Sequence, residues 1–146
     1  DHRYLHSFPT RRSSDLYKID IKGSGNFFID SPFNDLQTLS IAGSGDINGD
    51  VPMKLGDLEL KIAGSGNIEM KGTAQLVKAT IAGSGNIYLG GLAATEAECL
   101  IMGSGDMEIN AVKSLKARIN GSGDIRYSGN PVSDIKVNGS GRIEKL

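Results

Sequence analysis

Apolar and polar residues alternate on both sides of a Gly-Ser-Gly tripeptide that occurs seven times along the chain, at spacings of 18 to 21 residues. The residue two positions before each tripeptide is Ile or Val. Each tripeptide is followed by one polar residue and then by Phe, Ile or Met. Alternation with a period of two on both sides of a glycine turn predicts strand, corner and strand in every repeat. No segment shows a comparable period of 3.6, so we predict little helix.

The glycines of these tripeptides are predicted to be structural corner positions. They make up 14 of the 20 glycines in the chain. Glycine inside a regular strand costs roughly 0.5–1 kcal/mol relative to alanine, so fourteen would cost an amount comparable to the stability of a whole domain. We therefore expect each corner to need a positive φ or a close backbone approach. The predicted corner glycines are Gly23, Gly25, Gly43, Gly45, Gly64, Gly66, Gly83, Gly85, Gly103, Gly105, Gly121, Gly123, Gly139 and Gly141.

The polar residues five positions before each tripeptide distinguish a solenoid from a series of hairpins. They are Lys18, Thr38, Glu59, Lys78, Glu98, Lys116 and Asp134, and from Glu59 onward the sign of the charge alternates. Equivalent positions of a parallel solenoid stack about 4.8 Å apart, where opposite charges attract. Hairpins would not make these positions neighbours. We predict an all-β fold, a parallel β-solenoid of about seven coils of roughly 20 residues each.

Residues 1–16 show neither the period of two of a strand nor the period of 3.6 of a helix, and they are interpreted as a non-native segment. The codons of a short-read sequencing adapter translate to SFPTRRSSDL, which is identical to Ser7–Leu16. We expect residues 1–16 to be a disordered, adapter-derived segment, and residues 17–146 to be a solenoid domain that is truncated at its N-terminus. His2 and His6, the two histidines of the chain, both lie in the excluded segment.

The corner repeats resemble a known bacterial family. The segments IAGSGDI at 41–47, IAGSGNI at 62–68 and 81–87, and INGSGDI at 119–125 are similar to the repeats of the head-GIN-domain family of putative autotransporter adhesins. The likeness covers residues 17–146. It implies a right-handed parallel β-helix and an extracytoplasmic location, which can be periplasmic, cell-surface or secreted. It supplies no catalytic residues.

Composition excludes several classes of partner and cofactor. The formal net charge is −1, which gives no electrostatic reason to expect nucleic acid. No apolar run approaches the roughly 20 residues of a transmembrane helix. A single cysteine excludes an internal disulfide and a Cys-based zinc cluster. We expect no cofactor, and we expect a glycan or a cell-surface protein as the partner.

The two ends of the column are expected to differ in how they protect their open strand edges. Arg142, Glu144 and Lys145 are predicted to blunt the C-terminal edge, whereas the coil at Tyr17–Ile29 has no evident cap. We therefore expect self-association through exposed solenoid ends.

Two kinds of polar position are candidates for chemistry. Residues 17–146 contain no histidine, so Ser-His-Asp and Cys-His catalysis are excluded there. Cys99 falls at an inward position that is typical of a core thiol. The residues that follow the tripeptides are expected to cap the corners with side-chain hydrogen bonds. They are Asn26, Asp46, Asn67, Asn86, Asp106, Asp124 and Arg142. Asp106 and Asp124 would be stacked neighbours, so a shared calcium ion is an alternative role for that pair.

The sequence favours a structural or adhesive module without catalysis, one that presents a repetitive polar surface for binding. The alternative is a carbohydrate-active β-helix enzyme, a polysaccharide lyase or hydrolase whose outward carboxylates act as acid or base. The carboxylates for that role are Glu59, Glu69, Glu98 and Glu108. The outward aromatic residues Phe28 and Tyr88 are further candidates for contact with sugar rings.

Overall fold

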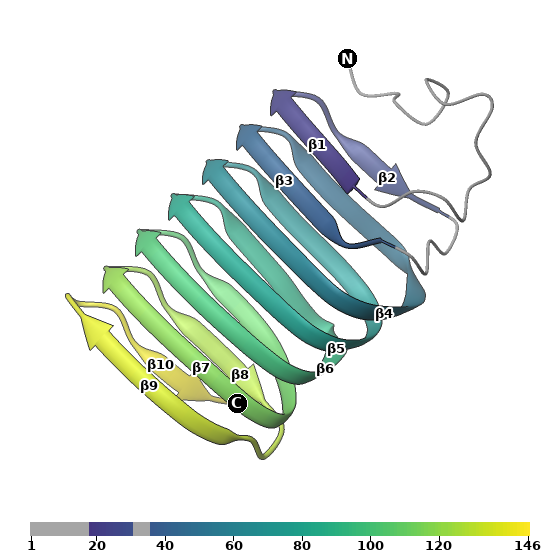
Figure 1. Cartoon of the computed structure of the whole chain (residues 1–146). Coiled ribbons are helices and arrows are strands. Elements are labelled where there is room, and N and C mark those ends of the chain that lie inside the picture. The colour runs from purple at the N-terminus through teal and green to yellow at the C-terminus, as the bar shows by residue number, and fades with distance from the viewer. Residues whose placement is uncertain (1–17, 31–35) are drawn as a thin grey trace.

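The computed structural model describes residues 18–30 and 36–146, and in this part every regular element is a strand (Figure 1). The predicted adapter segment lies outside the described residues. The strands are β1 (Lys18–Gly23), β2 (Phe27–Ile29), β3 (Thr38–Gly43), β4 (Asp46–Gly64), β5 (Asn67–Gly83), β6 (Asn86–Gly103), β7 (Met107–Gly121), β8 (Ile125–Ser128), β9 (Val132–Asn138) and β10 (Ile143–Lys145).

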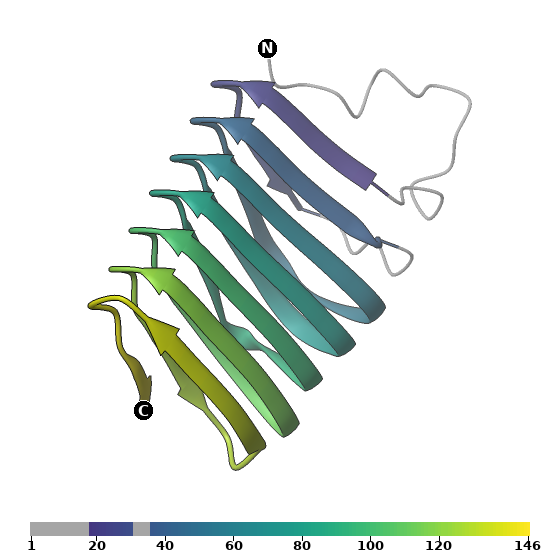
Figure 2. The same cartoon turned by 60° about the vertical axis from the view of Figure 1, so that its left-hand side comes forward.

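Each coil stacks on the next with parallel strand pairing, so equivalent residues lie side by side. Ile62 of β4 pairs with Ile81 of β5, and Ile81 pairs with Ile101 of β6. The same pairing joins β1 to β3, β3 to β4, β6 to β7 and β7 to β9. The predicted all-β parallel solenoid is therefore confirmed. Its seven corners bound about six full turns, and Figure 2 shows them aligned along one edge of the column.

The core is a continuous stack of apolar side chains enclosed by the coils. One coil, β5, buries every second residue on two of its sides, namely Ile68, Met70, Ala74, Val77, Ala79 and Ile81. The alternation slips where two or more consecutive residues are not buried, at 71–73 and at 75–76, and there the chain bends. No polar or charged side chain is buried in the described ranges. Because a single coil cannot enclose these residues, the stacking itself creates the core.

The two glycines of each corner meet different physical requirements. The first glycine has a φ between 101° and 144°, a region that residues with a Cβ rarely adopt. The second glycine lies against the coil below it. From Gly45 onward, a Cβ at this position would be 1.8 to 2.3 Å from the carbonyl oxygen of the equivalent glycine in the preceding coil. From Gly43 onward, a Cβ at the first position would also lie 2.2 to 2.5 Å from the carbonyl oxygen of the equivalent glycine in the preceding coil. The corner thus excludes a side chain at the first position by conformation and contact, and at the second by contact alone.

The C-terminal coil is the exposed end of the described column. Arg142, Glu144 and Lys145 are exposed, but they lie on and beside β10 rather than on β9. The β9 strand leaves Val132 80% exposed and Ile135 43% exposed. The predicted charged protection therefore covers only one side of this end.

Candidate functional site

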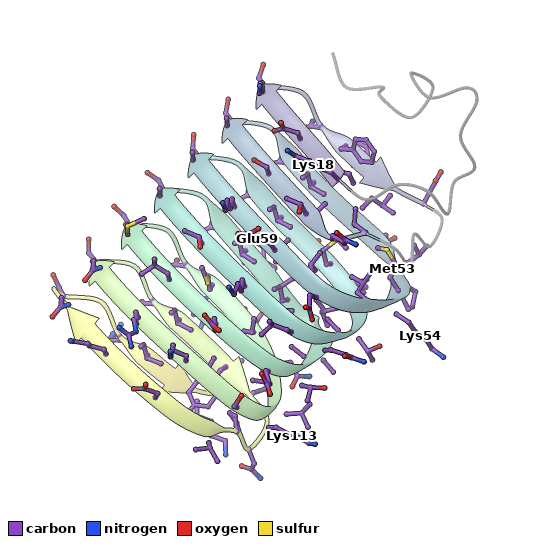
Figure 3. All side chains as sticks on the ribbon, in the orientation of Figure 1. Lys18, Met53, Lys54, Glu59 and Lys113 are labelled. Atoms are coloured by element: carbon purple, nitrogen blue, oxygen red, sulfur yellow. The ribbon has the colours of Figure 1, made fainter. Side chains whose placement is uncertain are left out.

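A row of polar side chains, all charged except Thr38, runs along the outer face of the sheet that precedes the corners. It contains one residue from each successive strand, Lys18, Thr38, Glu59, Lys78, Glu98, Lys116 and Asp134, and we call it the charged ridge. The strand register makes every one of these residues the direct neighbour of the next. Figure 3 shows Lys18 and Glu59 projecting from the same face. The alternation of charge predicted for a parallel stack is therefore present on adjacent rungs.

A groove follows the ridge on the side where the chain bends, and we call it the bend groove. Its wider part is a hollow of about 580 Å³ that Leu36, Gly56, Asp57 and Leu76 line together with ridge residues. A Cβ at Gly56 would meet open space, because this position has no atom of another residue nearby. The groove continues past Leu76 into a hollow of about 280 Å³ beside Glu96 and Ser114. Leu76 lines both hollows, and together their lining residues extend from β3 to β9 beside the ridge.

A second groove follows the opposite side of the ridge, and we call it the sheet groove. Its hollow has a volume of about 220 Å³. One wall consists of Lys78, Glu98 and Lys116 of the ridge, and the other contains Leu100 and Arg118. Ala79 and Cys99 form its floor. The charged ridge therefore stands between two grooves that run parallel to the long axis of the solenoid.

One ridge charge, that of Glu59, has a solvent-exposed ion-pair partner. The Nζ atom of Lys61 lies 3.4 Å from Oε2 of Glu59 on the same strand, and both side chains are largely exposed. Exposed ion pairs contribute only about 0–1 kcal/mol to stability. A polar ligand can therefore replace such contacts at little cost to the fold.

The four candidate catalytic carboxylates occupy two different rows. Glu59 and Glu98 belong to the ridge and are separated by Lys78. Glu69 and Glu108 lie on the strands that follow the corners and are separated by Tyr88. The backbones of each pair are thus two rungs apart, or about 9.6 Å. The register places no two of the four on adjacent rungs.

The polar residues that follow the corners form a ladder of hydrogen bonds between coils, which we call the corner ladder. The Oδ1 atom of Asp106 accepts a hydrogen bond from the backbone N–H of Asp124 at 2.9 Å. Asp124 in turn accepts from the N–H of Arg142 at 2.9 Å. Asn26, Asp46 and Asn86 accept from the next coil in the same way. The side chains cap backbone groups as expected, but the donors belong to the neighbouring coil.

The two carboxylates proposed to share calcium are part of this ladder. Asp106 and Asp124 are stacked and half-buried, and Nη2 of Arg142 lies 4.0 Å from Oδ2 of Asp124. Within residues 18–30 and 36–146, no group of three or more His, Cys, Asp or Glu side chains gathers to hold a metal ion. A calcium ion at this pair stays a prediction.

The two groups with shifted pKa values have structural explanations. Cys99 is buried in the core, and loss of solvent raises the pKa of its thiol to about 12, with a smaller contribution from Glu98. Lys71 donates a hydrogen bond to Oδ1 of Asp50 at 2.9 Å, and this bond raises the pKa of the lysine. The Cys99 thiol is therefore protonated at neutral pH, as expected of a core residue.

The sequence predicted the ridge but not the grooves beside it. The sequence pattern assigns no role to Leu76 or Gly56, because each stands where the alternation slips at a bend. The signal available in the sequence was the two consecutive non-apolar positions Gly56 and Asp57, which interrupt the period of two. That interruption indicates a bend, but it does not reveal a hollow.

Comparison with known families identifies the repeat. The model of the family described as "Putative auto-transporter adhesin, head GIN domain" matches residues 12–131. The chain belongs to this family. No helix among the described residues of this head GIN domain is long and apolar enough to cross a membrane. None of the curated proteins matches the chain.

Solved structures of bacterial proteins share the fold of this head GIN domain. A putative adhesin from Bacteroides fragilis NCTC 9343 is 31% identical with a TM-score of 0.78, and the match covers 90% of this chain and 61% of that protein. A putative lipid binding protein from Parabacteroides distasonis ATCC 8503 is 33% identical with a TM-score of 0.70, covering 90% and 62%. A putative adhesin from Parabacteroides merdae ATCC 43184 is 29% identical with a TM-score of 0.68, covering 90% and 64%. The head GIN domain described here spans less than two thirds of each relative.

Proposed function

We propose that this chain is an extracytoplasmic binding module without catalytic activity, and that it holds an extended glycan along the charged ridge. One observation carries the proposal, namely that the ridge stands between two grooves that both follow the long axis of the column. Such a surface suits a linear ligand that contacts several coils at once. The description of the family as an adhesin supports both a binding role and a location outside the cytoplasm.

The spacing of the ridge favours a glycan over a peptide. Neighbouring rungs are about 4.8 Å apart, close to the length of one sugar ring in an extended polysaccharide, whereas an extended peptide advances about 3.3 Å per residue. Lys78 and Lys116 present ammonium donors on alternate rungs, and Glu59 and Glu98 present carboxylate acceptors between them. Hydrogen bonds to charged groups are the stronger class of such bonds, so this alternation suits hydroxyl and carboxylate groups of a sugar chain.

The absence of catalysis is part of the proposal and rests on the solvent exposure of the candidate carboxylates. Glu59 and Glu98 are separated by a lysine, and Glu69 and Glu108 by a tyrosine. All four are at least partly exposed to solvent. Such exposed positions lack the enclosed arrangement of a glycosidase acid.

A binding experiment with matched variants tests the proposal. Purified chain is screened against immobilised polysaccharides, and binding to the best of them is measured by calorimetry. The double variant Lys78→Gln/Lys116→Gln should bind at least about tenfold more weakly, because it loses two charged donors. The control Lys22→Gln/Lys113→Gln removes the same charge away from the ridge and should bind normally.

Three outcomes would overturn the proposal. Equal loss in both double variants would show that the ridge is not the binding surface. Shortening of the polysaccharide during incubation, followed by size-exclusion chromatography, would show catalysis. Binding to phosphatidylcholine or phosphatidylglycerol vesicles in place of any glycan would instead assign a lipid ligand, as the name of one solved relative says of that protein.

A further inference from the structure

A second row of side chains lies beside the charged ridge on the outer face of the same sheet. It contains one residue from each of β4 to β7, namely Lys61, Thr80, Leu100 and Arg118, and we call it the second row. The attraction between neighbouring strands explains the alternating charges of the ridge, but it does not explain a row with two cations and no acid. The sheet groove lies between this row and the ridge.

Three cations of the sheet groove have no ion-pair partner. Lys78, Lys116 and Arg118 line the hollow, and all three are exposed. None of the ion pairs in the described part of the chain involves any of them. Glu59, in contrast, is already paired with Lys61. The groove therefore offers positive charge to an anionic ligand, although the whole chain has a formal net charge of −1.

The bend groove carries the opposite charge on the wall that faces the ridge. Successive strands place Asp57, Leu76, Glu96 and Ser114 side by side along this wall. The four residues include two acids and no cation. An anionic ligand would be repelled by this wall and attracted by the second row of the sheet groove. Charge therefore distinguishes two grooves that run in the same direction.

The charge along the sheet groove changes sign from one strand to the next. The β5 strand contributes the cation Lys78, and the β7 strand contributes the cations Lys116 and Arg118. Between them, β6 contributes the acid Glu98 and the half-buried Leu100. The two cationic strands are two rungs apart, or about 9.6 Å, which is close to the length of two sugar rings. A chain with one anionic group in every second sugar would therefore meet a cation at each of these groups.

The side chains of β7 and β6 suit two different sugars. Lys116 and Arg118 are exposed on one face of the same strand, two residues or about 6.6 Å apart. A guanidinium group binds a carboxylate with two parallel hydrogen bonds, and the ammonium group adds a charged donor. On β6, Glu98 accepts hydrogen bonds from hydroxyl groups and repels a carboxylate, while Leu100 offers contact to the C–H face of a ring. The β6 strand therefore suits a neutral sugar.

We propose that the ligand is a linear polysaccharide in which acidic and neutral sugars alternate, and that it lies in the sheet groove. One acidic sugar contacts Lys78 and the next contacts Lys116 and Arg118. The neutral sugar between them lies over Glu98 and Leu100. This assignment rests on the proposed glycan-binding function, and it adds the class of polysaccharide, the groove and the order of the sugars.

Four polysaccharides of matched length test the class of ligand. Hyaluronan and unsulfated chondroitin alternate acidic and neutral sugars, polygalacturonate carries a carboxylate on every ring, and hyaluronan methyl ester has the backbone of hyaluronan without its charge. Calorimetry with the full chain should show that at least one alternating polymer binds about tenfold more tightly than the other two probes. Added NaCl should reduce the preference for hyaluronan over its methyl ester, because salt screens exposed charges.

Single-residue variants test the groove and the order of the sugars. Arg118→Gln should weaken binding of the alternating polymer about tenfold, whereas Arg126→Gln removes the same charge from β8, after the corner, and should bind normally. Glu98→Gln removes the repulsion on β6, so it should strengthen binding of polygalacturonate severalfold and change binding of the alternating polymer little. Asp57→Asn changes the bend groove and should have no effect. Circular dichroism of each variant reports whether it is folded.

The results can contradict this assignment without contradicting glycan binding. Equal affinity for hyaluronan and its methyl ester would reject an acidic ligand, even if Lys78→Gln/Lys116→Gln still weakens binding at the ridge. Equal effects of Arg118→Gln and Arg126→Gln would reject the sheet groove. Unchanged binding of polygalacturonate to Glu98→Gln would reject the alternation. A chain that binds no polysaccharide at all would contradict the proposed function, and this assignment with it.

Discussion

At the scale of single residues, the corner ladder shows how a polar side chain serves the coil next to its own. Asp106 accepts a hydrogen bond from the backbone N–H of Asp124. Its replacement by alanine should reduce the free energy of unfolding by about 1 kcal/mol, because the half-buried N–H loses its acceptor. Asp106→Asn keeps the acceptor oxygen and should retain the stability. Urea denaturation of the two variants measures both values.

The same pair of variants tests the calcium hypothesis. If a cation binds between Asp106 and Asp124, calcium should raise the melting temperature of the original chain and have a smaller effect on Asp106→Asn. An unchanged melting temperature across a calcium titration of the original chain would count against the cation. A loss of stability in Asp106→Asn equal to that in Asp106→Ala would show that the acceptor oxygen is not what stabilises this position.

At the scale of the element, the corner explains why the tripeptide repeats so strictly. Gly105→Ala should destabilise the chain by about 3 kcal/mol or more, since the added Cβ would lie 1.9 Å from the carbonyl oxygen of Gly85. Ser104→Ala is the matched control at the exposed centre of the same corner and should be nearly neutral. Thermal unfolding followed by circular dichroism compares them. Similar melting temperatures for both variants would contradict the backbone contact.

The element scale also shows what the sequence could predict and why. Residues equivalent to Ile81 and Gly83 occur at fixed positions in every repeat. The strands, the corners and the stacking order could therefore be predicted from the periodicity. The donors of the corner ladder could not be predicted from periodicity, because a side chain such as Asn86 can cap its own corner or reach the next one. The bend groove could not be predicted either, because the hollow that Gly56 lines depends on how two bends are oriented in space. Periodicity specifies register, but it does not specify the shape of a surface.

At the scale of the whole molecule, stability is shared between neighbouring coils and should therefore vary along the column. The middle strands β5 and β6 are covered on both sides, whereas β9 is exposed along most of its length. Amide hydrogen exchange followed by mass spectrometry should be slowest in β5 and β6 and fastest in β9 and β10. Uniform protection from end to end would contradict this gradient.

The direction of the hydrogen bonds has a mechanical consequence for the column. Because every strand pairs with the strand of the next coil, the bonds between coils point along the axis of the column. A force that separates the two ends of the chain would load one coil at a time and peel it from its neighbour. Each peeled coil would release 18 to 21 residues, or about 60–75 Å of extended chain. The column would then lengthen in repeated steps and absorb tension, instead of failing at once.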